Sequence, residues 1–473
     1  MKNKTCLVAK KCSGCQLSNM NYAQQLEYKQ KDAEKLLGGF GKVNPIIPME
    51  NPYNYRNKVQ AVFRSDRNGR IISGVFQSAR NGIVGVDRCF LNDEKADEII
   101  VGIRELLRSF KIQPYDIGTG RGFLRHVLVR VGKKSGEILV TLVGASHMFP
   151  KKHDFVSALV KKFPEITTVT FSVNTNPEML LLGDNDETLF GNGYIVDELC
   201  GKKFRISPRS FYQINSVQTE KLYNYAINEA NLRKTDNILD AYSGVGTIGI
   251  IASDYVKSVQ GVEYNAAAVR DAVKNCAENG LTRKIAFNKA DAGDFLREKA
   301  KNGTFYDVVF MDPARAGADR KFLYSLLKIQ PTRIVYISCN PATLSRDLKT
   351  LAKYYDITDI QPFDMFPHTR HVETVCLLSK LNARQHIEIN LDMDELDLTA
   401  AESKATYEEI KRYVLEHTGL KVSSLYIAQV KQKCGIIERE NYNKPKSENA
   451  KQPQCPHDKE KAIKEALLHF GMI

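Results

Sequence analysis

Two side chains in the last third of the chain have the chemistry needed to attack an unreactive ring and later release it. Cys339 follows the apolar run 334–337, and Glu373 comes 34 residues further along. A thiolate is a soft nucleophile, and a carboxylate acts as a general base. Such a pair suits addition of an enzyme thiol to a ring, followed by elimination. A cysteine at a strand end is more often a small buried apolar residue, so the neighbouring motifs must decide its role.

A glycine-rich turn at residues 240–249 predicts a cofactor site. It follows an apolar strand and opens a helix, where glycines permit a tight turn and close approach of a ligand. Gly244, Gly246 and Gly249 fit the G-x-G-x-x-G spacing of NAD sites. However, the acidic Asp240 would repel a pyrophosphate, and it suits the amino group of a methionine-derived cofactor. We therefore expect S-adenosylmethionine rather than NAD.

Two further acidic residues extend this site along the chain. Glu263 ends the next strand, 23 residues after Asp240, where a carboxylate can accept both hydroxyls of a ribose. Asp291 follows the next apolar segment, near the expected edge of an adenine ring. Together they predict that the pocket binds a nucleoside.

Four cysteines in the first 90 residues are candidate metal ligands: Cys6, Cys12, Cys15 and Cys89. Four thiolates suit either tetrahedral zinc or a four-iron cluster, and the residues alone leave both open. The spacing is not the C-x3-C-x2-C of radical S-adenosylmethionine enzymes, so we expect no radical mechanism. Because the first residues lack the apolar core of a secretory signal, we expect reduced thiols and a cytoplasmic protein.

The composition is that of a globular protein with a polyanionic partner. The 473 residues are enough for about three domains, and 43% of them are hydrophobic. The formal net charge is +13, which favours nucleic acid as the partner, with simple solubility charge as the alternative. No apolar stretch approaches the roughly 18 residues needed to span a bilayer, so no membrane partner is expected.

Residues 1–204 are expected to form a strand-rich domain that bears the cysteines and binds RNA. Short alternating strands are predicted at 59–64, 128–131 and 138–143. A basic tract lies on and around them: Arg121, Arg125, His126, Arg130, Lys133 and Lys134. This tract either faces RNA or guards a solvated sheet edge, and the sequence leaves both open.

Residues 205–382 alternate short apolar strands with amphipathic helices, which predicts an α/β domain with a mainly parallel sheet. The expected strands are 237–239, 258–262, 307–311, 333–337 and 373–378, and the expected helices include 266–279 and 320–327.

Residues 383–473 read as an acidic linker followed by a small helical extension. Helices are expected over 405–419 and from Ser423 or Ser424 to Gly435, and a last short helix follows a polar linker. The first two resemble a helix-turn-helix, with Lys431 and Lys433 on the second. Most helical hairpins bind no nucleic acid, so RNA contact here stays open.

Four ordered motifs carry a resemblance to a known family. They are Ser210-Phe211-Tyr212-Gln213-Ile214-Asn215, Asp312-Pro313-Ala314-Arg315, Cys339-Asn340-Pro341 and His371-Val372-Glu373-Thr374-Val375. In this order they closely resemble the bacterial RNA 5-methyluridine methyltransferases, which are class I, S-adenosylmethionine-dependent enzymes. The N-terminal cysteines are similar to the iron–sulfur ligands of the 23S ribosomal RNA branch. The resemblance covers about residues 1–380.

The resemblance implies a Rossmann-like class I methyltransferase domain with a mostly parallel seven-stranded sheet. It also implies that Cys339 adds to C6 of a uracil, C5 takes the methyl group, and Glu373 removes the C5 proton before Cys339 leaves. Arg315 would support the uracil or its phosphate. The expected cofactor-binding residues are Gln213, Tyr242, Gly244, Glu263, Asp291 and Asp312. The expected ligands of a [4Fe-4S] cluster are Cys6, Cys12, Cys15 and Cys89.

Three departures from the family pattern affect the expected target more than the chemistry. Ala314 replaces a common proline, we expect no TRAM domain before Cys6, and the region after 381 is additional. We expect 23S ribosomal RNA as the substrate of a monomer with no obligate protein partner. The alternatives are a tRNA uracil-5-methyltransferase, an amino-group methyltransferase or a catalytically silent RNA-binding factor. The second of these expects an aromatic residue where Arg315 stands.

Overall fold

The structure is a computed structural model that describes residues 6–66, 68–77, 82–176, 182–183, 186–381, 407–418, 420–434 and 455–469. The chain divides into two compact units, Met1–Gln385 and His386–Ile473. In the part of the chain described, no helix has the length and apolar character needed to cross a membrane.

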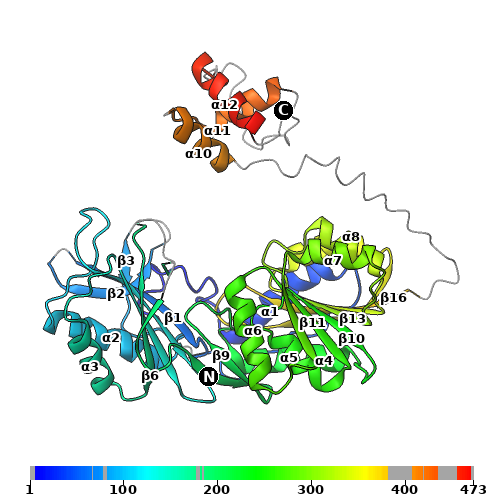
Figure 1. Ribbon diagram of the computed structural model, residues 1–473, viewed down its shortest axis with the longest axis horizontal. Coiled ribbons are helices and arrows are strands. Elements are labelled where there is room, and N and C mark those ends of the chain that lie inside the picture. The colour runs from blue at the N-terminus through cyan, green and yellow to red at the C-terminus, as the bar shows by residue number, and fades with distance from the viewer. Residues whose placement is uncertain are drawn as a thin grey trace. The chain divides into compact units, whose positions relative to one another are not determined.

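The first of two large sheets in unit 1 is mostly antiparallel (Figure 1). Its strands, in spatial order, are β3 (Ile83–Gly85), β2 (Ile71–Phe76), β1 (Lys58–Ser65), β4 (Leu124–Val131), β5 (Ile138–Gly144), β6 (Ile166–Val173) and β7 (Asp186–Phe190). Only β5 and β6 pair in parallel, because α3 (Lys152–Lys162) provides the crossover between them.

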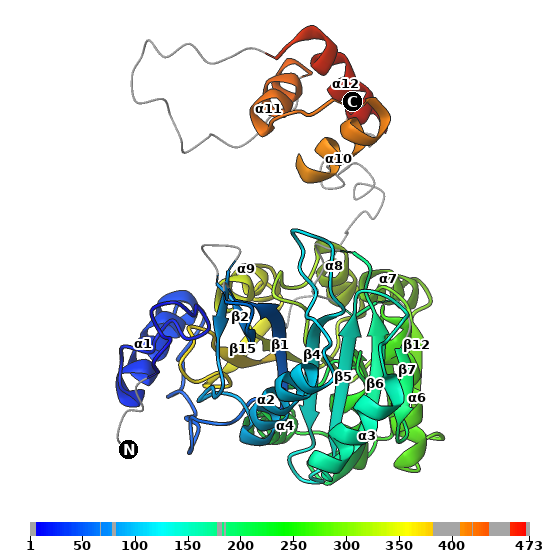
Figure 2. The same cartoon turned by 90° about the vertical axis from the view of Figure 1, so that its left-hand side faces the viewer.

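Helices α2 (Glu94–Ser109) and α3 cover one face of this sheet, as both ribbon views show (Figures 1 and 2). Alternate strand residues point into the shared core, as a period of two requires. They include Val127 and Val129 of β4 and Val140 and Leu142 of β5. The expected strands at 59–64, 128–131 and 138–143 therefore exist.

The second sheet has the strand order β12–β11–β10–β13–β14–β16–β15. Its strands are β10 (Asn237–Ala241), β11 (Ser258–Glu263), β12 (Ile285–Lys289), β13 (Val308–Met311), β14 (Arg333–Ser338), β15 (Tyr355–Phe363) and β16 (Glu373–Lys380). The first five are parallel, and β16 runs antiparallel to both β14 and β15. The predicted α/β fold with a mostly parallel seven-stranded sheet is confirmed, although the expected strands included neither β12 nor β15.

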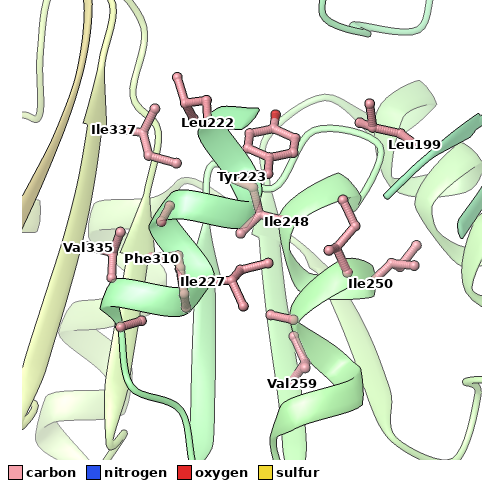
Figure 3. Close-up of a cluster of buried hydrophobic side chains, with 14 of the residues drawn as sticks. Leu199, Leu222, Tyr223, Ile227, Ile248, Ile250, Val259, Phe310, Val335 and Ile337 are labelled. Carbon is pink, nitrogen blue, oxygen red and sulfur yellow. The ribbon is translucent and has the colours of Figure 1, made fainter. Parts of the chain in front are cut away.

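Successive residues of the central strands point to opposite faces of this sheet and pack into two different hydrophobic cores. Ile238 packs with α4 (Ser216–Glu229) and α5 (Thr247–Ala252), whereas Leu239 packs on the other face. Figure 3 shows the first of these cores, where Leu222 and Ile227 of α4 lie against Phe310 and Val335 of the sheet. The helices that contribute to the opposite core are α7 (Ala292–Lys301), α8 (Arg320–Ile329) and α9 (Pro341–Leu351). The result is a three-layer sandwich.

Three smaller elements complete unit 1 around the second sheet. The short 3-10 helix at Ser253–Tyr255 follows α5, and helix α6 (Ala266–Glu278) follows β11. Cys276 of α6 joins the core that α4 and α5 form with the sheet. A separate hairpin, β8 (Ile195–Leu199) and β9 (Lys202–Ile206), also packs into that core.

Helix α1 (Tyr22–Leu37) packs on the second sheet although it lies early in the chain. A capping box between Asn21 and Gln24 starts it. Its buried Ala33 and Leu37 join the core formed by α7, α8 and α9, and Figure 1 shows the blue helix among the green and yellow elements. The expected segment 1–204 thus contributes to both sheets, and its boundary stays a prediction.

Three members of the expected basic tract are buried in unit 1, so neither of the two interpretations that the sequence left open describes them. Arg125, His126 and Arg130 are buried. Arg125 donates to the carbonyl oxygen of Asn174 at 2.6 Å, and Arg130 donates to Ser210 O. These cations satisfy backbone acceptors inside unit 1, because a charge out of water needs such partners.

The two lysines of the tract are also engaged. Lys133 pairs with Asp93, and Lys134 Nζ lies 2.7 Å from Glu220 Oε1. Arg121 is the member of the tract that stays exposed without a described side-chain ion pair.

Unit 2 contains three described helices, α10 (Tyr407–Thr418), α11 (Ser424–Lys433) and α12 (His457–His469), around a small core. Ser423 caps α11 as predicted. Lys431 is buried and Lys433 Nζ lies 2.6 Å from Glu460 Oε2, so both lysines have partners or neighbours within unit 2, and RNA contact here stays a prediction. The expected acidic patch lies outside the described residues, and so does the linker expected at 441–457, except for its last three residues.

Candidate active site

Three predicted site residues meet at the end of the second sheet where its parallel strands have their carboxyl termini. Asp312 follows the carboxyl end of β13, and Cys339 follows that of β14. Glu373 begins β16, which runs antiparallel to β14 with Ser338 opposite Thr374. Because adjacent strands are only about 4.8 Å apart, this register brings the thiol and both carboxyl groups to one place.

Burial changes the acid–base properties of this group. Glu373 is 5% exposed, and its Oε2 has no hydrogen-bond partner among the described residues. Burial and then the nearby Asp312 raise the pKa of Glu373 to about 8, while Arg315 opposes the shift. Burial raises the pKa of Asp312 to about 7. A carboxyl in such surroundings is suited to accept a proton near neutral pH.

The surroundings of Cys339 favour the protonated thiol in the free protein. Burial, then Glu373 and Asp312, raise the pKa of the half-buried Cys339 to about 11, and Arg315 acts in the opposite direction. The thiol proton must therefore leave during attack on a bound substrate, because the thiolate is the nucleophile.

The loop after Cys339 is tied to the loop after β13. Asn340 Nδ2 donates to Arg315 O at 3.2 Å, and Thr343 Oγ1 donates to the same oxygen at 3.3 Å. Asn340 Oδ1 also accepts from Ala342 N and caps α9. The Arg315 guanidinium lies 3.4 Å from Nε2 of His371, so the three family motifs form one contiguous surface.

The glycine-rich turn holds a buried carboxylate under it. Asp240 Oδ2 accepts from Gly249 N at 2.8 Å, and Oδ1 is buried with no partner among the described residues. A Cβ at position 249 would lie 2.9 Å from Oδ2, so glycine is required for this close approach. Burial, then the nearby Asp312 and Glu263, raise the pKa of Asp240 to about 7 against the Gly249 hydrogen bond.

Glu263 approaches the same turn from β11. Its Oε2 accepts from Gly244 N at 3.0 Å, and its Oε1 accepts from Asn265 N at 2.7 Å. Asp240, Glu263 and Asp312 thus surround a region that favours a cation. The ammonium and sulfonium groups of S-adenosylmethionine fit these acidic side chains, and the ammonium could donate to the unpartnered Asp240 Oδ1.

Two more predicted cofactor residues border the turn. Tyr242 has a left-handed backbone (φ 62°), and its ring lies 5.2 Å from that of Phe322. Gln213 O accepts from Asn57 Nδ2 at 3.0 Å, and its side chain hydrogen-bonds with the Tyr223 hydroxyl. Sequence reasoning missed Tyr223, because a buried tyrosine on an amphipathic helix has no distinguishing local signal.

Asp291 has a structural task in the free protein. It caps α7 through a 3.0 Å hydrogen bond from Asp294 N, and it pairs with Lys321 Nζ at 3.0 Å. The expected adenine contact stays a prediction.

The four N-terminal cysteines line a single cavity of about 580 Å³, together with Arg56 and His368. Burial, then Cys89, raise the pKa of Cys15 to about 12. Within the described residues, no group of three histidine, cysteine or acidic side chains has an arrangement that would hold a metal ion. Four thiols around one cavity match the donor set of a four-iron cluster, but they do not converge on a point.

The comparisons identify the family. The sequence model of the tRNA (uracil-5-)-methyltransferase family matches residues 21–381. The chain belongs to this family. An uncharacterized RNA methyltransferase of Halalkalibacterium halodurans is 39% identical over 383 residues, which cover 80% of this chain and 83% of the relative. A second, from Listeria innocua, is 36% identical over 379 residues, which cover 79% and 83% of the two chains.

A solved member of the uracil-5-methyltransferase family shares the fold. The crystal structure of Pyrococcus abyssi tRNA (uracil-54, C5)-methyltransferase in complex with S-adenosyl-L-homocysteine matches with a TM-score of 0.65 and 30% identity. The match covers 78% of this chain and 86% of that one. The predicted class, an S-adenosylmethionine-dependent RNA methyltransferase with a class I fold, is confirmed.

Proposed function

We propose that this enzyme methylates C5 of a uridine in 23S ribosomal RNA through a covalent bond between Cys339 and C6. The observation that supports the proposal is the meeting of Cys339, Glu373 and Asp312 at one sheet edge. Carbon 5 of uracil is a poor nucleophile until C6 is attacked. A methyltransferase acting on oxygen or nitrogen would need no enzyme thiol.

Each residue then has a defined step. Cys339 gives its proton to water as its sulfur bonds to C6, which moves the C5–C6 electron pair onto C5 and the C4 carbonyl. Bound S-adenosylmethionine supplies the methyl group that C5 takes. The Glu373 carboxylate removes the C5 proton, the C5–C6 double bond reforms, and the sulfur leaves with its electron pair. The target base must also leave its stack, at a cost of a few kcal/mol, which is lower in a loop.

The cofactor is proposed to occupy the acidic region under the glycine-rich turn. Asp240 would face the ammonium group, and Glu263 would accept the ribose hydroxyls once its bond to Gly244 N is exchanged. The other proposed contacts are Gln213, Tyr242, Gly244, Asp291 and Asp312.

We propose a [4Fe-4S] cluster on Cys6, Cys12, Cys15 and Cys89, with zinc as the alternative. The support is the shared cavity and the chemistry of four thiols. Protein purified without air should be brown, absorb near ~400 nm and contain about four iron atoms per chain. A colourless preparation with one zinc per chain would refute the cluster.

The RNA target is the least constrained part of the proposal. The four cysteines favour ribosomal RNA through the resemblance, whereas the matched family and the Pyrococcus abyssi protein are named for tRNA. Mapping 5-methyluridine in both RNAs, from cells with and without the gene, separates the two. Loss confined to tRNA would refute the ribosomal assignment. A ribosomal substrate also implies a cytoplasmic enzyme, which we propose acts as a monomer.

A mechanism-based substrate tests the covalent step. RNA that contains 5-fluorouridine has no C5 proton to remove, so the adduct should persist on a denaturing gel. It should be lost in Cys339→Ala and kept in Cys200→Ala, a matched change of another half-buried thiol. An adduct that survives in Cys339→Ala would refute the nucleophile. Methyl transfer retained in that variant would instead support an amino-group methyltransferase.

A further inference from the structure

Helix α1 buries a row of four residues, two of them polar and two apolar. Gln25, Lys29, Ala33 and Leu37 lie on one face at intervals of four, and each is 0% exposed. Ala33 and Leu37 pack on the second sheet. A lysine and a glutamine in the same row need polar partners, because burying such groups without them is costly.

Both polar side chains bind one short segment that precedes Glu373. Lys29 Nζ pairs with Asp364 Oδ1 at 2.5 Å, with both side chains fully buried, and also donates to Phe366 O at 3.0 Å. Gln25 Oε1 accepts from His368 N at 2.9 Å, and Gln25 Nε2 lies 3.2 Å from His368 Nδ1.

The backbone of this segment is held from several other parts of unit 1. Four consecutive carbonyl oxygens accept hydrogen bonds, each from a different element: Met365 O from Asn215 Nδ2 (2.8 Å), Phe366 O from Lys29 Nζ (3.0 Å), Pro367 O from Tyr55 Oη (3.0 Å) and His368 O from Leu17 N (3.0 Å). His368 also has a left-handed backbone (φ 69°), which the surrounding contacts must maintain.

The segment joins the end of β15 to the start of β16, so its position sets that of Glu373. The Glu373 side chain itself has a buried oxygen with no described partner, and its placement therefore depends on the backbone that carries it. Asp364 Oδ2 is likewise buried without a described partner. A buried ion pair often adds little stability over an apolar pair, so its retention here favours a geometric role.

We propose that Gln25 and Lys29 are positioning residues that hold the segment 364–372 so that the Glu373 carboxylate reaches the C5 proton of the methylated adduct. This inference rests on the proposed function. In the step concerned, the proton passes from C5 to Glu373, the C5–C6 double bond forms, and the bond from C6 to the Cys339 sulfur breaks. The attack by Cys339 and the methyl transfer precede this step and do not need the base.

The proposal predicts that variants of Gln25 and Lys29 slow the breakdown of the adduct much more than its formation. Lys29→Met and Gln25→Met should form the 5-fluorouridine adduct within about 3-fold of the wild-type rate. With ordinary RNA, breakdown should slow by about 10- to 100-fold, since a misplacement near 1 Å can have that effect. The methylated adduct should then accumulate. Lys31→Met on the same helix is the matched control, because Lys31 is 71% exposed and pairs only with exposed Glu27.

The outcomes are distinguishable from failure of the proposed function. If Lys29→Met does not fold, Lys29→Met/Asp364→Asn leaves no unpaired charge, and Gln25→Met changes no charge at all. Unchanged breakdown in folded variants would overturn the positioning role, and so would equal slowing of formation and breakdown. A wild-type enzyme that forms no adduct, or a Glu373→Gln variant that does not accumulate one, would instead refute the proposed function.

Discussion

The raised pKa of Glu373 predicts a specific pH dependence for one step of the reaction. Glu373 can remove the C5 proton only as a carboxylate, and its pKa in the free protein is about 8. The ionised fraction is then about 0.1 at pH 7 and about 0.9 at pH 9, so adduct breakdown should accelerate by about 10-fold over this range. An ordinary glutamate, with a pKa near 4.3, would be ionised throughout and give no such increase.

Single-turnover kinetics isolate this step. Enzyme and S-adenosylmethionine, both in excess over the RNA, are mixed with it, and samples are quenched at intervals and separated on denaturing gels. The decay of the protein–RNA adduct is then fitted at each pH from 6.5 to 9. Once the methyl group has left, the cofactor product has lost the sulfonium charge, so the acidic residues return to surroundings close to those of the free protein.

The Glu373→Gln variant provides the control, because an amide cannot accept the proton. Its residual decay should be slower by about 10²- to 10⁴-fold and should lack the rise with pH. A wild-type decay rate that is constant from pH 7 to 9, in protein that stays folded, would refute the assignment of Glu373 as a base with a raised pKa.

Three further predictions concern the buried acids and the glycine-rich turn. Binding of cationic S-adenosylmethionine at pH 7 should release protons, because the cation lowers the pKa of Asp240 and Asp312 from about 7; calorimetry in two buffers with different ionisation enthalpies measures this, and equal heats would contradict it. The thermal midpoint of the free protein should fall from pH 6 to 8. A folded pKa above the unfolded one means that the native state binds more protons, so stability is lost as pH rises through the folded pKa, and a rising midpoint in differential scanning calorimetry would argue against these shifts. Gly249→Ala should lower stability by about 1–3 kcal/mol and weaken cofactor binding, because its Cβ would press on Asp240, whereas Gly39→Ala has open space around it and should be neutral in denaturant unfolding.

The sequence predicted the parts of the site that depend on local pattern. Asp312 and Cys339 were expected at strand ends, and apolar runs bounded by turns identify such positions without any knowledge of the fold. The glycine-rich turn was expected for the same reason, since a tight turn that opens a helix needs its glycines nearby in sequence. The fold class followed from the alternation of strands and helices.

Features that depend on distant partners could not be predicted. The burial of Arg125 and Arg130 was not expected, because their charge says nothing about the distant carbonyl oxygens that accept their hydrogen bonds in the fold. The strand β15 escaped notice because Asp356 and Asp359 interrupt its apolar pattern. The role of α1 was hidden because Lys29 has the appearance of a surface residue until Asp364 is placed beside it.

The contact between Lys29 and Asp364 also sets an order of events during synthesis. The two residues are 335 positions apart in the chain. At about 5–20 residues per second, roughly 15–70 s pass between translation of α1 and translation of the segment it binds. Throughout that interval, Ala33 and Leu37 have no complete sheet to cover, and Asp364, the partner of Lys29, is not yet part of the chain. Helix α1 is therefore made early, but it is among the last elements to reach its final position. The nascent chain holds no assembled active site until nearly all of unit 1 has left the ribosome.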